Sequence, residues 1–87
     1  MLLEGQTAFI TGGGGRLGRA IARCCQREGA AVVIADLNLA AAKAVAADLA
    51  SSGRTAAVAG DVSRKDDVLR MVDEAEAALG LPDILIN

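Results

Sequence analysis

The sequence predicts an α/β fold, with a doubly wound parallel sheet and helices on both of its faces. Short apolar runs alternate along the chain with longer segments whose apolar residues recur every three or four positions. The apolar runs are continuous rather than alternating, which is typical of strands covered on both faces. Together these two observations predict the order βαβαβαβ within a single unit, residues 1–87.

The first strand is predicted over residues 7–11, and it stops at a run of glycines, residues 12–15. A helix follows over residues 16–28, and Gly29 ends it as a C-terminal cap. Positions spaced i, i+3, i+4 and i+7 form its predicted inner face: Leu17, Ala20, Ile21 and Cys24.

The second strand is predicted over residues 31–36 and ends at Asp36. Asn38 is a good N-cap for the helix that follows, and Gly53 closes that segment. Its predicted apolar side comprises Leu39, Ala42, Val45, Ala46 and Leu49.

The third strand is predicted over residues 55–59. Ser63 is expected to open the third helix, with Asp66 three residues on as a weaker relative of a capping box. Its predicted buried stripe comprises Val68, Val72, Ala75 and Leu79. Gly80 stops the helix, and the fourth strand is predicted over residues 83–87.

Right-handed crossovers between parallel strands predict the spatial order 3-2-1-4, with the direction of winding reversing between strands 1 and 4. A ligand crevice forms outside the carboxyl ends of strands at such a reversal. The glycine turn, Asp36, Asp61, Val62 and Asn87 are all predicted to lie at that edge.

Composition excludes several function classes. The net charge of -2 and the scattered basic residues argue against nucleic acid and anionic membranes as partners. No apolar run approaches the roughly 20 residues of a membrane span, and no signal peptide is visible. Cys24 and Cys25 are adjacent, which suits neither a disulfide nor a metal site, and there is no histidine. We therefore expect buried, reduced cysteines, no metal and a cytoplasmic protein.

The glycine turn carries the functional signal. Gly13, Gly15 and Gly18 satisfy G-x-G-x-x-G between a strand and a helix, the fingerprint of a Rossmann-type dinucleotide site. Missing side chains let a pyrophosphate approach the backbone, and the free N–H groups of the helix N-terminus attract it. Asp36 lies near the distance expected of the acid that holds the adenosine ribose, although it could also be a solvated strand-end residue or a helix cap.

With these motifs in order, the chain resembles the N-terminal part of a short-chain dehydrogenase/reductase. The matching pieces are residues 11–18, residues 18–22, Asp36, residues 61–62 and residues 83–87. One piece departs from the pattern. The short branch of the family usually has glycine where this chain has Arg16, and the spacing of Gly12, Gly15 and Gly18 fits the extended branch instead. The downstream pieces resemble the short branch.

The resemblance implies a set of cofactor-binding residues. The turn would cradle the pyrophosphate and adenosine ribose, through Gly12, Gly14, Gly15, Arg16, Leu17 and Gly18. Asp36 would bind the ribose hydroxyls and Leu37 would flank the adenine. Asp61 would accept from the adenine amino group beside Val62, and Asn87 would lie against the ribose. Simpler readings make Asp61 a turn residue and Asn87 a strand-end residue without a ligand.

The resemblance also implies oxidoreduction of an alcohol or ketone by hydride transfer with NAD. Asp36 favours NAD over NADP, whereas Arg16 could favour the 2′-phosphate of NADP. The family's catalytic Tyr-x-x-x-Lys is absent, because residues 1–87 contain no tyrosine. We therefore expect the cofactor-binding part of a protein that continues beyond Asn87, without catalytic residues of its own, and a homo-oligomer when full length. The alternative is a stand-alone, non-catalytic dinucleotide-binding module.

Overall fold

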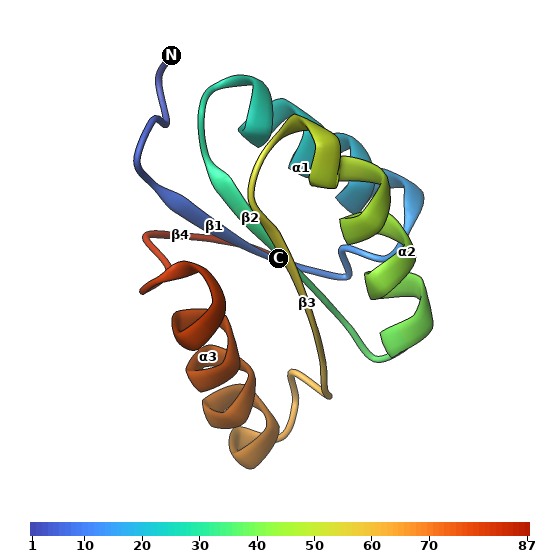
Figure 1. Cartoon of the computed structure of the whole chain (residues 1–87). Coiled ribbons are helices and arrows are strands. Elements are labelled where there is room, and N and C mark those ends of the chain that lie inside the picture. The colour runs from blue at the N-terminus through green and yellow to red at the C-terminus, as the bar shows by residue number, and fades with distance from the viewer.

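The computed structural model describes all 87 residues, in the predicted order of strands and helices (Figure 1). The elements are β1 (Thr7–Thr11), α1 (Arg16–Arg27), β2 (Ala31–Asp36), α2 (Leu39–Leu49), the short 3-10 helix η1 (Ala50–Ser52), β3 (Thr55–Ala59), α3 (Lys65–Leu79) and β4 (Ile84–Ile86). The α/β class and the alternation of strands and helices are confirmed.

All four strands are parallel and lie in the order β3-β2-β1-β4, as predicted. Helices α1 and α2 cover one face of the sheet and α3 covers the other (Figure 1). Ala8, Ile10, Val32 and Ile34 pack toward α1 and α2, whereas Phe9, Val33, Ala35 and Val58 pack toward α3. Because successive side chains of a strand point to opposite faces, burial on both faces requires the continuous apolar runs seen in β1 and β2.

The predicted inner face of α1 is wrong at three of its four positions. Leu17 is 75% exposed and Ala20 and Cys24 are also exposed, whereas Ile21 is partly buried and packs against the core. The buried residues of α1 are Gly18, Ala22, Cys25 and Gln26. The glycine turn sets this rotation of the helix. A Cβ on Gly18 would lie 2.6 Å from Gly12 O, so this side of the helix faces the turn and the sheet.

The two cysteines therefore have different environments, contrary to the expectation that both are buried. Cys24 is exposed and Cys25 is buried. Burial raises the pKa of the Cys25 thiol, and the neighbouring Cys24 raises it further. Neither forms a disulfide, and no cluster of residues suited to a metal ion is present.

Helix α2 begins as predicted, because the Asn38 side chain accepts a hydrogen bond from the N–H of Ala41 at 3.1 Å. Its buried side is also confirmed, except that Leu39 is 42% exposed.

Helix α3 begins at Lys65, and its N-cap is Arg64, which makes no side-chain hydrogen bond, rather than the predicted Ser63. Ser63 does not cap the helix, because its amide and hydroxyl both donate to Asp61. The side chain that reaches back is Asp67 rather than Asp66. Met71, absent from the predicted stripe, is 1% exposed, whereas Val68 and Val72 are half-buried.

Strand β4 is shorter than predicted and forms an edge of the sheet. Asp83 lies before it and accepts a hydrogen bond from the N–H of Thr7 at 2.8 Å. Leu85 is 65% exposed at this edge. No helix combines the length and hydropathy needed to cross a membrane.

Candidate dinucleotide site

A cavity of about 340 Å³ lies at the carboxyl ends of the strands, at the edge the topology predicted. It brings together the turn after β1, the end of β2, the segment after β3 and the end of β4. Its lining residues are Thr11, Gly12, Ala35, Asp36, Leu37, Gly60, Asp61, Val62 and Asn87. Every predicted binding residue downstream of the glycine turn therefore borders one space.

Close packing explains several glycines of the turn. Gly12 has φ +65°, a conformation that side chains other than glycine rarely adopt. A Cβ on Gly13 would lie 2.8 Å from Ile34 Cγ2, because the turn packs onto β2. Gly13 is a packing requirement that the predicted binding list omitted, although its place in the fingerprint could have indicated it. Gly15 differs, since its nearest Cβ contact would be an ordinary 3.6 Å to Gly12 O.

The amides of the turn divide into occupied and free donors. Gly13 N donates to Ala35 O at 3.0 Å and Gly15 N donates to Gly12 O at 3.2 Å. Gly14 N donates to Asp36 Oδ2 at 3.1 Å. The amides of Arg16, Leu17 and Gly18 make no hydrogen bond, because they form the first turn of α1. Free donors at the positive end of a helix form an anion-binding site.

The Asp36 carboxylate is fixed at the end of β2 by two backbone donors. Its Oδ2 accepts from Gly14 N at 3.1 Å and its Oδ1 accepts from Asn38 N at 3.0 Å. A Cβ on Gly14 would come within 2.9 Å of Asp36 Oδ2, so only glycine leaves room for this contact. An ionised carboxylate has about four acceptor positions, so each oxygen retains capacity for a further donor. Asp36 is partly exposed and borders the cavity.

Asp61 borders the same cavity. Its Oδ1 accepts from the Ser63 hydroxyl at 2.6 Å and from the Ser63 amide at 2.9 Å, which leaves Oδ2 without a partner. These hydrogen bonds, first from the hydroxyl and then from the amide, lower the pKa of the Asp61 carboxyl below its usual value. Asp61 is therefore ionised and has one free acceptor oxygen.

Asn87 and Thr11 meet at the end of the paired strands β1 and β4. The Thr11 hydroxyl lies 3.2 Å from both Ile86 O and Asn87 Oδ1. The structure therefore places Asn87 at the cavity, next to the first residue of the glycine turn.

Arg16 lies elsewhere. It borders a separate groove on the outer side of α1, together with Arg19, Ala20, Arg23, Cys24 and Arg27. None of these residues borders the cavity that contains Asp36. Only the backbone amide of Arg16, at the helix N-terminus, belongs to the candidate site.

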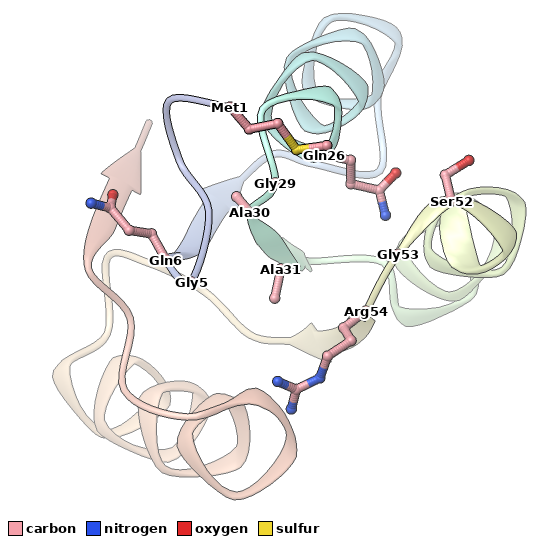
Figure 2. Close-up of a pocket in the computed structure, with 10 residues that line it drawn as sticks. All are labelled: Met1, Gly5, Gln6, Gln26, Gly29, Ala30, Ala31, Ser52, Gly53 and Arg54. Atoms are coloured by element: carbon pink, nitrogen blue, oxygen red, sulfur yellow. The ribbon is translucent and has the colours of Figure 1, made fainter.

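A further cavity, of about 390 Å³, lies at the opposite, amino end of the sheet (Figure 2). Gln26 reaches from α1 toward Gly53, and its Nε2 donates to Leu49 O at 3.0 Å while Oε1 has no partner. None of the predicted binding residues lines this cavity. The candidate site is therefore the one at the carboxyl ends.

Comparison with known proteins identifies the family. The model of the family described as short chain dehydrogenase matches residues 6–87. The chain is 45% identical over 87 residues to sorbitol dehydrogenase from Cereibacter sphaeroides, covering 100% of this chain and 33% of that protein. It is 42% identical over 87 residues to 3beta-hydroxysteroid dehydrogenase 2 from Eggerthella lenta, covering 99% of this chain and 34% of that protein. The chain thus spans about a third of the length of these curated relatives.

Solved structures share the fold. A 3-ketoacyl-(acyl-carrier-protein) reductase from Brucella melitensis, complexed with NADH, superposes with a TM-score of 0.87 at 40% identity, covering 95% of this chain and 34% of that chain. A hydroxysteroid dehydrogenase from Escherichia coli gives a TM-score of 0.88 at 34% identity, covering 95% of this chain and 36% of that chain.

Proposed function

Because the chain belongs to the short-chain dehydrogenase family, we propose that residues 1–87 form the NAD-binding part of an oxidoreductase acting on an alcohol or ketone. The observation that carries this proposal is the single cavity bordered by Asp36 and Asp61, beside the free amides of the α1 N-terminus. NAD supplies the hydride acceptor of the reaction and NADH the hydride donor. The chain's own residues bind and orient the adenosine end.

The pyrophosphate would bind at the first turn of α1. The free amides of Arg16, Leu17 and Gly18 are its donors, since those of Gly13 and Gly15 are already used within the turn. This assignment accounts for Arg16 standing where the short branch of the family usually has glycine, because a backbone amide can bind phosphate whichever side chain the residue carries. Arg16 borders the groove on the outer side of α1, and this assignment does not require its side chain.

The adenosine ribose would bind at Asp36, whose two oxygens each retain acceptor capacity. A carboxylate there accepts from both ribose hydroxyls but repels the 2′-phosphate of NADP. Arg16, the basic residue that could counter this preference, borders a different groove. We therefore propose NAD as the cofactor.

The adenine would lie between Leu37 and Val62, two apolar residues at the cavity that are 74% and 57% exposed. Burying such exposed apolar side chains against an aromatic ring is favourable. The free Oδ2 of Asp61 would then accept from the adenine amino group.

A stand-alone binding module remains the second candidate, because residues 1–87 contain no tyrosine to act as the family's acid–base residue. Equilibrium titration with NADH, NADPH and ADP-ribose tests the binding function shared by both candidates. We expect NADH and ADP-ribose to bind and NADPH to bind at least about tenfold more weakly. Equal binding of NADPH, or no binding of ADP-ribose, would contradict the assigned site. Alcohol-dependent reduction of NAD, assayed on the full-length protein, separates an enzyme from a binding module.

A further inference from the structure

We propose that Arg70 and Asp67 of α3 are positioning residues for adenine recognition. They hold the segment of residues 60–62 in the orientation that presents Asp61 to the adenine amino group. This inference rests on the proposed NAD-binding function, and neither residue borders the cavity itself. Their effect on the cofactor is therefore exerted through the backbone of the segment after β3.

Two hydrogen bonds join α3 to this segment and to Ala59, the residue before it. Arg70 Nη2 donates to Ala59 O at 2.8 Å, at the last residue of β3. Asp67 Oδ2 accepts from Asp61 N at 2.8 Å. The two side chains also face each other, since Arg70 Nη2 lies 3.7 Å from Asp67 Oδ1. Glu74 supports Arg70 from the next turn, with both carboxylate oxygens 3.4 Å from Nη1.

Hydrogen bonds hold successive backbone groups from Ala59 to Asp61. The carbonyl of Ala59 accepts from Arg70, and the amide of Gly60 donates to Asp36 O at 3.1 Å. The amide of Asp61 then donates to Asp67. These bonds set the direction in which the Asp61 side chain leaves the backbone. The bond from Gly60 also joins the segment of residues 60–62 to Asp36, the residue proposed to bind the ribose.

Gly60 shows how closely the segment packs on α3. A Cβ there would lie 2.9 Å from Met71 Sδ and 3.1 Å from Arg70 Nη2. The Arg70 side chain thus fills the space beside the glycine. Arg70 and Glu74 are each 47% exposed, and exposed ion pairs contribute little to stability. The bond from Arg70 to Ala59 O is better explained by orientation of the segment than by global stability.

A base-discrimination experiment tests this role. NAD and its hypoxanthine analogue differ at C6, where the analogue has a carbonyl oxygen in place of the adenine amino group, and at N1, which carries a hydrogen in the analogue. Asp61 accepts from the amino group but is repelled by the carbonyl, so the unmodified chain should bind NAD at least about tenfold more tightly. Arg70→Met retains the apolar stem but removes the donor, and we expect the preference to fall below about threefold. Asp67→Ala should have the same effect.

Two further variants serve as a conservative replacement and as a control. Arg70→Lys can still donate to Ala59 O and should keep most of the preference. Lys65→Met removes a charge from an exposed position of the same helix and should leave the preference unchanged. Thermal melts establish that each variant is folded, and Asp67→Ala provides the result if Arg70→Met does not fold.

The possible outcomes separate this inference from the proposed function. If the unmodified chain binds neither nucleotide, both ideas fail. If it prefers NAD and both Arg70→Met and Asp67→Ala keep that preference, only the positioning role fails. Equal weakening of both nucleotides, with the ratio unchanged, would show a purely structural role and would also overturn the inference.

Discussion

Replacing Asp36 by alanine should reduce the preference for NAD over NADP. Asp36→Ala removes the carboxylate that faces the cavity and accepts from Gly14 N and Asn38 N. The 2′-phosphate of NADP then meets no negative charge at the end of β2. The ribose hydroxyls of NAD lose their acceptor in the same step. Both effects reduce the difference between the affinities for NAD and for NADP.

The electrostatic magnitude follows from the exposure of the site. Two unit charges 4 Å apart interact by about 1 kcal/mol in bulk water and about 4 kcal/mol at an effective dielectric constant of 20. Asp36 is partly exposed, so about 1.5–3 kcal/mol is a reasonable range. This corresponds to a change of about 10–100-fold in the ratio of dissociation constants. Loss of the ribose hydrogen bonds should also weaken NAD binding itself.

Calorimetric titration of both cofactors measures this ratio, and the intrinsic fluorescence of the reduced nicotinamide ring is an alternative readout. Asp48→Ala is the matched control, since Asp48 is an exposed aspartate of α2 paired with Arg19, remote from the cavity. It should leave the ratio unchanged. If Asp36→Ala also leaves the ratio unchanged, Asp36 does not bind the ribose and the proposed basis of the NAD preference is wrong.

Three other groups of predictions concern the glycine turn, Ser63 and strand β4. Gly18→Val should chiefly lower the melting temperature, because its Cβ would lie 2.6 Å from the turn backbone. Gly12→Val should chiefly abolish binding of NADH. An unaltered affinity of Gly12→Val for NADH would contradict the assignment of this turn to phosphate binding. Ser63→Ala should return the lowered pKa of Asp61 toward its usual value. Because the pKa of Asp61 is lower in the folded than in the unfolded protein, ionised Asp61 stabilises the fold at pH values above its unfolded-state pKa, and this stabilisation is lost as the pH falls through its folded-state pKa. An NMR titration of the Asp61 carboxyl that shows no change in Ser63→Ala would refute this. A polypeptide of residues 1–87 should show no dehydrogenase turnover and should self-associate through the β4 edge, where Leu85 is 65% exposed. Leu85→Lys should reduce the mass measured by light scattering, and an unchanged mass would exclude that edge.

Local patterns in the sequence were sufficient to predict the α/β class, the strand order and the edge at which the site lies. Continuous apolar runs report burial on both faces, and alternation of strands and helices leaves few parallel topologies. Asp36, Asp61 and Asn87 were predicted at one edge because parallel strands all end there, and they border one cavity. Their role in binding remains a prediction.

Only the tertiary structure decided the rotation of α1 and the contacts that hold the site. The apolar stripe containing Leu17 and Cys24 satisfies helical periodicity as well as the buried one does, so periodicity cannot choose between them. The choice depends on how closely Gly18 approaches the turn. The contact of Arg70 with Ala59 O could not be predicted either, because no local pattern around these two residues indicates that they meet when α3 packs against β3. Such contacts join distant segments, and their distances arise only when the chain is folded.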